Sequence, residues 1–382
     1  MKKILLITPE YPPHGSGIGN VVSRLRTELE TIGIGVDLIS RGSQESPRMI
    51  VESKLPGIAG LIPFWERVTR LALMRKGDYD LIWMHAPLLI NARHLASFSN
   101  LMISFHSSYV GSYQALKSHQ HVRLLPYYGL ASKIQSRFLR ELSRTRNTTI
   151  TAVSPSVADE LYANGLDHPV QIVPNGIGAL GSDEALESGM RVKLLRLCNA
   201  SNAEDERILI YSGRITEVKQ IGLLLRLFGQ IRSLRPKTHF LVLGSGNLLC
   251  RTKKQAALIP NVHILGSRQH AAVMEVLEGA DAFISLSCYE GLPLAVLEAA
   301  SHRLPLILSD IPAHRYISSR FDNPTVLLNS RDPDPAQVVA FLDRIRRRIG
   351  AGQGLPPEFA WDNIVRSYLN LVRVRSDPDS SS

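Results

Sequence analysis

Two cations follow a strand-like run in the second half of the chain. Arg214 comes directly after "ILIYSG", and Lys219 follows five residues later in "GRITEVK". At the carboxyl edge of a parallel sheet, an arginine offers a planar fork and a lysine a point charge, and the two together can clamp a diphosphate. A plain ion-pairing role for either residue is the alternative that this spacing leaves open.

Two glutamates stand further along, in "CYEGLPLAVLEAAS", where seven residues separate Glu290 from Glu298. Residues 291–293 lead from a loop into an apolar helix, whose first N–H groups can face an anion. The spacing puts both carboxylates on the same general side of the helix, toward one ligand. Alone, each glutamate could be a helix-dipole partner or a surface residue. Together with the two cations, they favour a ligand site.

The stretch "PEYPPHGSGIGN" (residues 9–20) has the strand, glycine turn and helix layout of a phosphate-binding loop. A dinucleotide fingerprint requires G-x-G-x-x-G directly after the strand and an acid at the end of the second strand. Here the glycines fall at 15, 17 and 19 after an insertion, and Asp37 lies inside the second strand pattern. We therefore disfavour a nicotinamide or flavin site. A helix N-terminus facing another anion and a plain turn both remain.

Short apolar runs alternate with helical patterns in two successive series, separated by a break near residues 174–183. The first series contains "KKILLIT", "GVDLIS", "YDLIWMH", "LMISFH" and "TITAVS". The second contains "RILIYSGR", "HFLVLGSG", "NVHILG", "DAFISLS" and "PLILSD". Strands that alternate with helices predict α/β architecture with parallel sheets, and two series predict two Rossmann-like domains.

The composition narrows the class of protein. A net charge of +10 predicts an anionic partner, but the basic runs lack the interleaved aromatic residues of nucleic-acid readers, so we expect no nucleic acid. The first apolar run is shorter than the roughly 7–15 residues of a signal peptide, and no run reaches the ~18 residues of a membrane span. Three cysteines without disulfide or zinc spacing suit a reducing cytoplasm.

The chain resembles the retaining GT-B glycosyltransferases of family four, also called glycosyl transferases group one. The resemblance rests on "PEYPPHGSGIGNVVSRL", "FHSS", "TAVSPSVADEL", "IVPNGI", "GRITEVK", "VLGSGN", "ILGS" and "SCYEGLPLAVLEAAS", in this order. It implies two Rossmann-like parallel-sheet domains, 1–172 on the acceptor side and 173–356 on the nucleotide-sugar side, facing a deep interdomain cleft. A helix at 357–375 would cross back to the first domain, and 376–382 would be a disordered tail.

The resemblance also implies catalytic roles for individual residues. Arg214 and Lys219 would hold the diphosphate of a nucleoside-diphosphate sugar, the donor substrate. Glu290 would bind a hydroxyl of the transferred sugar. His106 of "ISFHSS" would lie near the reacting sugar, although on its own it reads as a structural histidine. His85 matches a frequent family position too, and we expect it to be structural.

Further residues would bind the donor. Glu298 would hold the ribose hydroxyls, N–H groups around Leu292 to Leu294 would meet the distal phosphate or sugar, and Gly266 to Arg268 would seat the base. The opening loop would form the opposing lip of the clamp. The implied donor-binding set is Gly15, Gly17, Gly266, Arg268, Gly291, Leu292, Pro293, Leu294 and Glu298. The chain departs from the family pattern at Ser16 and at Gln220, where glycines are usual.

The resemblance implies retaining transfer to a hydroxyl acceptor, such as a glycan or lipid-linked sugar of surface polysaccharide or glycolipid synthesis. The two "DPD" motifs, 332–334 and 377–379, follow no apolar strand, so we expect no catalytic metal and no cofactor besides the donor. The alternatives are a noncatalytic sugar-nucleotide-binding subunit and an epimerase. Residues 51–74 and 137–146 offer apolar and basic surface for peripheral contact with the inner face of an anionic membrane, unless they face the core.

Overall fold

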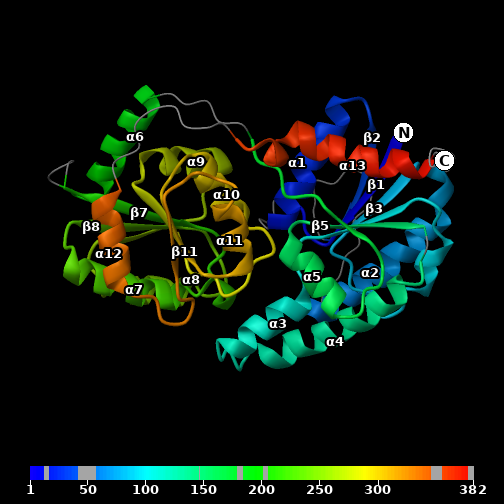
Figure 1. Ribbon diagram of the computed structural model, residues 1–382, viewed down its shortest axis with the longest axis horizontal. Helices are drawn as coiled ribbons and strands as arrows, with labels where there is room; N and C mark the ends of the chain where they lie inside the picture. Colours follow the sequence, from blue (N-terminus) through cyan, green and yellow to red (C-terminus); the bar gives the residue numbers. More distant parts are fainter. Residues whose placement is uncertain are drawn as a thin grey trace. The chain divides into compact units, whose positions relative to one another are not determined.

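The computed structural model describes residues 1–12, 17–41, 57–145, 147–178, 184–200, 205–345 and 355–376. The chain divides into two compact units (Figure 1). Unit 1 comprises Met1–Gly176 and Pro357–Ser382, and unit 2 comprises Ile177–Pro356. Each unit has its own sheet and its own buried core.

The sheet of unit 1 has the order β2-β1-β3-β4-β5-β6, and every neighbouring pair is parallel. Its strands are β1 (Lys3–Thr8), β2 (Gly35–Ser40), β3 (Leu81–His85), β4 (Leu101–Phe105), β5 (Thr148–Ala152) and β6 (Val170–Ile172). Strands β3 and β4 are buried along their whole length and β1 is buried after its first residue, which explains their continuous aliphatic runs. Because β1 pairs with both β2 and β3, the loops after β1 and β3 diverge at a topological switch point.

The helices of unit 1 each turn an apolar stripe inward. They are α1 (Gly17–Thr31), α2 (Gly57–Met74), α3 (Tyr109–Ser118), α4 (Leu125–Leu142), α5 (Pro155–Ala163) and α13 (Trp361–Ser376). Helix α13 lies along α1 (Figure 1), so the C-terminal helix returns to the N-terminal domain as predicted. A Cβ atom on Gly176 would lie 2.6 Å from the Trp361 ring, so only glycine lets the chain pass this close to α13.

The sheet of unit 2 has the order β12-β11-β10-β7-β8-β9, again with parallel pairs. Its strands are β7 (Arg207–Ser212), β8 (Thr238–Leu243), β9 (Val262–Gly266), β10 (Ala282–Ser285), β11 (Leu306–Ser309) and β12 (Thr325–Leu328). Numbered within the unit, this is the 3-2-1-4-5-6 order of Rossmann folds, and its switch point lies between β7 and β10.

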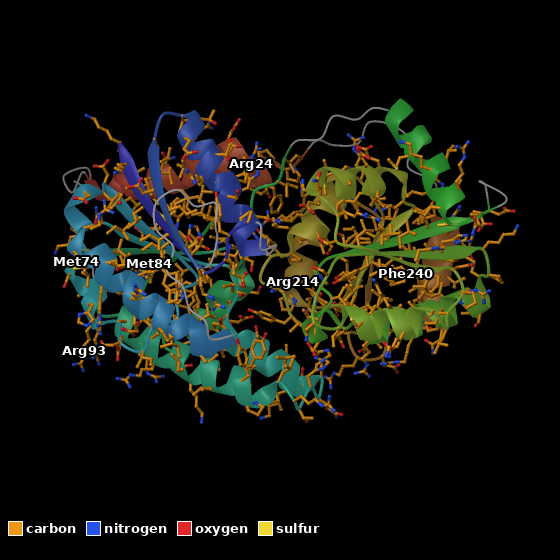
Figure 2. All side chains as sticks on the ribbon, turned by 180° about the vertical axis from the view of Figure 1, so that it is seen from behind. Arg24, Met74, Met84, Arg93, Arg214 and Phe240 are labelled. Carbon is orange, nitrogen blue, oxygen red and sulfur yellow. The ribbon has the colours of Figure 1, made fainter. Side chains whose placement is uncertain are left out.

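Helices cover both faces of the sheet in unit 2. They are α6 (Glu184–Leu197), α7 (Ile221–Leu234), α8 (Leu249–Ala256), α9 (His270–Gly279), α10 (Leu294–Ser301), α11 (Pro312–Ser318) and α12 (Pro335–Arg344). Helices α7, α8 and α12 lie on one face and α9 and α10 on the other (Figure 1). Phe240, labelled in Figure 2, is fully buried and its ring stacks 5.2 Å from Phe228 of α7. This packing fixes the strands whose ends carry the polar loops.

The two helix-flanked parallel sheets confirm the fold class predicted from the sequence. Strand β12 was not predicted from the sequence, because its apolar run, 326–328, is only three residues long. The first "DPD" motif, 332–334, begins four residues after this strand ends, so the expectation that neither motif follows an apolar strand is wrong for this one. Most of the expected tail lies outside the described residues, which end at 376. Within the described part of the chain, no helix has the length and apolar character needed to cross a membrane.

Candidate active site

The switch point of unit 2 brings two of the predicted residues into direct contact. The loop after β7 carries Lys219, and the loop after β10 carries Glu290. The Lys219 ammonium forms an ion pair with the Glu290 carboxylate, and both side chains are largely buried. The two loops are also joined through their backbones, since Cys288 N–H donates to the Val218 carbonyl at 2.9 Å. A cation and an anion therefore lie side by side at the carboxyl edge of the sheet.

Arg214 lies in the same loop as Lys219 but is exposed, and Figure 2 marks its place after β7. Among the described residues, its guanidinium makes no hydrogen bond or ion pair. The Tyr211 hydroxyl donates to the backbone carbonyl of Arg214 at 2.8 Å, which anchors the loop beneath the exposed side chain. The exposed guanidinium is therefore accessible to a ligand.

Burial alone would raise the pKa of the Glu290 carboxyl group. The Lys219 ammonium overcomes that effect by its charge and its hydrogen bond, with smaller help from His314 and the Ser287 hydroxyl, so the pKa lies below its usual range. His314 is itself fully buried on α11, and burial lowers its pKa to about 4. The Glu290 side chain is thus negatively charged at neutral pH, and the neighbouring Lys219, His314 and Ser287 stabilise that charge.

Gln220 explains how this loop folds without the glycine usual for the family. Its backbone is left-handed, with φ of 51°, a conformation in which glycine is the least strained residue. The side-chain amide donates to the carbonyls of Leu286, at 2.7 Å, and Ser330, at 2.9 Å. The glutamine therefore ties the loops after β7, β10 and β12 together, which offsets the strain.

Glycines let the loops after β7, β8 and β9 run in close contact. A Cβ atom on Gly244 would lie 1.8 Å from the Gly213 carbonyl oxygen, and one on Gly246 would lie 2.3 Å from that of Ile215. Gly266 ends β9 with φ of 72°, and its carbonyl accepts from Gly244 N–H at 2.8 Å. These contacts gather the loop ends of three strands into one edge. The predicted base-binding segment begins at Gly266 on this edge.

Arg268 follows Gly266 and is exposed just before α9 begins. At the start of that helix, His270 Nε2 lies 2.9 Å from Glu298 Oε1 on α10. The contact with Glu298 raises the pKa of His270, against a smaller opposing effect of burial. Glu298 and Glu290 thus contact different partners, His270 and Lys219, along the same sheet edge.

The segment between the two glutamates enters α10 at Leu294. Gly291, Leu292 and Pro293 are buried, and Leu294 is half-buried. Pro293 stands at the N-cap and carries no N–H, so only its neighbours can donate a backbone hydrogen bond to a ligand. The anion site predicted at this helix start can therefore use the N–H groups of residues 291, 292 and 294 only.

In unit 1 the predicted His106 lies at the carboxyl end of β4 and is 7% exposed. Its Nε2 is 3.0 Å from Nδ1 of the fully buried His85, at the end of β3. Burial lowers the pKa of His106 to about 4, against an opposing contribution from the Asn175 side chain. Burial and the neighbouring His106 lower the pKa of His85 as well. Both imidazoles are neutral at pH 7.

Helix α13 packs against the strands that carry the two histidines. The Tyr368 ring contacts Trp83 edge to face at 4.4 Å, and Trp83 stacks on His85 at 5.1 Å. The indole N–H of Trp83 donates to the Ser104 hydroxyl at 2.7 Å, and Tyr368 hydrogen-bonds to Ser104 as well. The C-terminal helix thereby fixes the strands that end in His85 and His106.

Gly17 opens α1 at the switch point of unit 1, and Gly15 and Ser16 lie outside the described residues. A Cβ atom on Gly17 would meet no described atom within 4 Å. Packing within the unit therefore does not require glycine there. Asp37, the candidate acid of a dinucleotide site, accepts a hydrogen bond from Tyr79 at 2.9 Å and pairs with Lys3 at 3.1 Å inside the fold.

Sequence reasoning missed three residues at this edge, namely Gln220 as a loop tie, His270 and His314. The sequence carried two partial signals. Gln220 replaces a glycine that is usual in the family, and His314 lies in "IPAHRYI" (residues 311–317), where the Gly-Gly-x-x-Glu ending common in the family is missing. For His270 there was none, because its partner Glu298 is 28 residues away on another helix.

Comparisons with known proteins identify the class of enzyme to which the chain belongs. A family model described as "Glycosyltransferase Family 4" matches residues 15–178, and one described as "Glycosyl transferases group 1" matches residues 199–336. The sucrose-phosphate synthase structure from Thermosynechococcus elongatus superposes with a TM-score of 0.71 at 17% identity, over 98% of this chain and 99% of that one. The two models together match most of the chain, and the chain belongs to the GT-B glycosyltransferases of family four.

Two curated relatives are similar along much of their length. An α-monoglucosyldiacylglycerol synthase from Acholeplasma laidlawii is 26% identical, over 80% of this chain and 80% of its own. A UDP-Gal:α-D-GlcNAc-diphosphoundecaprenol α-1,3-galactosyltransferase from Escherichia coli is 25% identical, over 68% of this chain and 65% of its own. The chain is thus a glycosyltransferase.

Proposed function

We propose that the enzyme moves a sugar from a nucleoside-diphosphate sugar to a hydroxyl group, with retention of configuration and without a metal ion or further cofactor. The observation that carries the proposal is the pairing of Lys219 with Glu290 beside exposed Arg214, at the switch point of unit 2. Ligands of open α/β sheets bind outside the carboxyl ends of the strands at this point.

In this proposal Arg214 and Lys219 hold the diphosphate. Breaking the glycosidic bond builds negative charge on the leaving diphosphate, and fixed cations stabilise charge where it develops. Lys219 would then exchange part of its contact with Glu290 for phosphate oxygens. Glu290 would turn its carboxylate to a hydroxyl of the sugar being transferred. His106, neutral at pH 7, could hydrogen-bond to that sugar without adding charge.

The remaining candidates bind the donor's other end. Glu298, oriented by His270, would accept hydrogen bonds from the ribose hydroxyls. Gly266 and Arg268 would seat the base, and Gly291 with the N–H groups of Leu292 and Leu294 beside Pro293 would meet the distal phosphate or sugar. Gly15 and Gly17 would border the diphosphate from domain 1–172, with domain 173–356 holding the nucleotide.

We further propose a glycan or lipid-linked sugar as the acceptor, because relatives are named for glucosyldiacylglycerol synthesis and for transfer onto a diphosphoundecaprenol-linked sugar. We propose a cytoplasmic enzyme that touches the inner face of an anionic membrane. Helix α2 does not support the contact, since Phe64, Trp65 and Val68 face the core. The better surface is the α3–α4 tip, where Val122, Tyr127 and Leu130 are exposed beside Arg123 and Lys133.

A ligand panel followed by one substitution tests the donor site. UDP-, GDP- and ADP-sugars are compared by thermal shift, and the one that raises the melting temperature identifies the nucleotide. Release of that nucleoside diphosphate is then followed in the native chain and in Arg214→Ala. We expect about 10²–10³-fold slower release, the scale for loss of one preorganised donor. Exposed Arg226 on α7 provides the matched control Arg226→Ala. Equal rates in all three proteins would refute the diphosphate clamp.

A further inference from the structure

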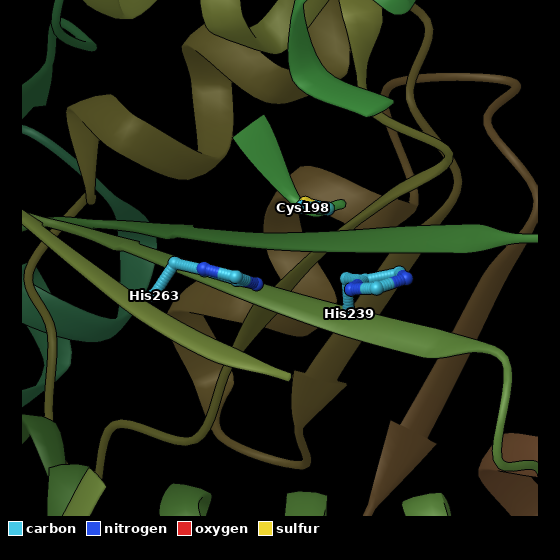
Figure 3. A group of neighbouring side chains, drawn as sticks. All are labelled: Cys198, His239 and His263. Carbon is cyan, nitrogen blue, oxygen red and sulfur yellow. The ribbon is translucent and has the colours of Figure 1, made fainter. Parts of the chain in front are cut away.

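A cysteine and two histidines converge in unit 2 (Figure 3). The two histidines lie at the amino ends of β8 and β9, the edge of the sheet opposite to the candidate active site. Cys198 follows the last residue of α6, His239 is the second residue of β8, and His263 is the second residue of β9. One potential ligand atom from each lies within 4.8 Å of those of the other two. Their spacing in the sequence, 198, 239 and 263, resembles no compact metal motif.

The strand register explains the convergence. His263 pairs with Leu241, so His239 lies two residues along the neighbouring strand and on the same face of the sheet. The two imidazole centroids are 5.9 Å apart. Cys198 reaches this face from α6 and is 5% exposed. His239 is 4% exposed, so the cluster is closed to bulk water on most sides.

The hydrogen bonds leave lone pairs directed into the cluster. Nε2 of His239 lies 2.9 Å from a Glu206 carboxylate oxygen, which can only accept, so this nitrogen carries the proton. Its other nitrogen, Nδ1, is buried and has no hydrogen-bond partner in the described part of the chain. Nε2 of His263 is likewise buried without a described partner. Two buried ring nitrogens without a partner are costly unless something binds them, and Nδ1 of His239 is the acceptor of the two whose lone pair the Glu206 contact defines.

We propose that Cys198, His239 and His263 bind a zinc ion, with a water molecule in the fourth position. A thiolate with two imidazoles is a donor set that suits Zn²⁺ and disfavours Mg²⁺ or Ca²⁺. Zn–S and Zn–N bonds of about 2.3 and 2.0–2.1 Å set ligand atoms about 3.3–3.6 Å apart, so small side-chain rotations complete the site. The Glu206–His239 contact supplies the carboxylate–histidine–metal relay that orients such ligands.

The ion would stabilise the fold and lie apart from the candidate active site. The two histidines lie at the amino ends of their strands, whereas Lys219 and Glu290 follow carboxyl ends, so the zinc would take no part in sugar transfer. It would fasten α6 to edge strand β9 and its neighbour β8. The same region is held by Arg191 of α6, which pairs with Asp281 at 2.5 Å. Binding would add the free energy of coordination to the stability of unit 2.

Cobalt substitution of the full-length chain tests the site. The protein is prepared metal-free and titrated with Co²⁺ and, separately, Zn²⁺ and Mg²⁺. We expect one tightly bound Co²⁺ per chain, with a thiolate-to-cobalt charge-transfer band and the intense visible bands of tetrahedral cobalt. Zn²⁺ should displace Co²⁺ and raise the melting temperature of unit 2, and Mg²⁺ should do neither. A cobalt spectrum without the thiolate band would overturn the proposal.

Variants assign the ligands. Cys198→Ser should abolish the thiolate band, whereas Cys250→Ser, at an exposed cysteine of α8, should keep it. Glu206→Gln keeps the shape of the side chain but weakens its contact with His239, and the affinity for Co²⁺ should fall about 10–100-fold. If Cys198→Ser does not fold, the native spectrum and the Glu206→Gln affinity still decide. An unchanged band in folded Cys198→Ser, or equal affinity in Glu206→Gln, would contradict the site.

Discussion

The contact between Lys219 and Glu290 makes a prediction about stability that needs no substrate. Both side chains are largely withdrawn from water, with 19% and 11% of their surface exposed. Glu290→Gln keeps the size of the side chain but removes the charge opposite Lys219. Lys219→Gln leaves a buried carboxylate with only His314 and Ser287 to support it. We expect each single variant to destabilise unit 2 and the double variant to lose less than the sum.

The magnitude follows from the exposure. Breaking a fully buried ion pair costs about 3–5 kcal/mol. Hydrogen bonds to charged groups contribute about 1.5–3 kcal/mol. Because water still reaches part of Lys219, we expect a coupling free energy of about 1.5–3 kcal/mol, the lower of these two ranges. For a unit of this size, each kcal/mol shifts the melting temperature by about 2–4 °C. The coupling is therefore equivalent to a shift of roughly 3–12 °C in the melting temperature of unit 2.

The chain offers an internal readout for each unit. Trp65, Trp83 and Trp361 are its three tryptophans, and all belong to unit 1, so indole fluorescence follows unit 1 alone. Far-ultraviolet circular dichroism follows both units. The double-mutant cycle is run in urea at pH 7, and only the transition without a fluorescence change should move. Additive single effects, or a shift confined to the fluorescence transition, would refute the coupling.

The sign of the pH effect gives a second criterion for the same cycle. The pKa of Glu290 is lower in the folded chain than in the unfolded one. Its contribution to stability is therefore complete above the ordinary carboxyl range and is lost as the pH falls through the folded value. The coupling should be present at pH 7 and vanish in acid. A coupling that persists when the carboxyl group is protonated would mean that packing, not charge, joins the two residues.

Three further outcomes follow from other parts of the structure. Gly17→Ala should fold normally, since its Cβ atom meets open space, but should turn over the donor more slowly than the native chain. The control Gly77→Ala, whose Cβ atom is equally unobstructed, should turn over the donor at the native rate. Equal turnover by the two variants would contradict the role of Gly17. Burial lowers the pKa of His106 from 6.5 to about 4, so between these values only the unfolded chain gains the proton. As the pH is lowered through this range, His106 should remove about 1.4 kcal/mol per pH unit from the unfolding free energy of unit 1, in addition to the loss from His85, whose pKa burial also lowers. Urea transitions followed by fluorescence should show a smaller slope in His106→Gln. Vesicles containing phosphatidylglycerol should sediment the native chain at low salt but not the variant Val122→Ser/Leu130→Ser, and no binding by the native chain would dismiss the membrane contact.

The sequence predicted the parts of the fold that depend on local pattern. Aliphatic runs such as residues 3–8 are typical of buried parallel strands, and their alternation with helical patterns predicted the two sheets. Because the carboxyl ends of parallel strands meet at one edge, the contact of Lys219 with Glu290 was within reach of the sequence as well. The roles of these residues stay predictions until the donor is bound.

The contacts that escaped prediction depend on partners far apart in the chain. Gln220 occupies a position where the family prefers glycine. The neighbouring sequence does not indicate that its side-chain amide donates to the carbonyl of Ser330, 110 residues further along the chain. His270 reads as a helix-start residue until Glu298 is placed beside it. In each case the residue type was visible, but its partner depended on how neighbouring loops pack.

The same limit explains why the cysteines suggested no metal. A compact zinc motif announces itself through ligands two to four residues apart. Here the ligands come from one helix end and two strands, and they meet only because the register of β8 and β9 sets His239 and His263 on one face. A one-residue slip of either strand would turn its histidine to the opposite face and disperse the cluster. The candidate active site at the carboxyl edge of the sheet could be predicted from the residues of its loops. The candidate metal ligands at the amino edge could not, because only the strand register brings them together.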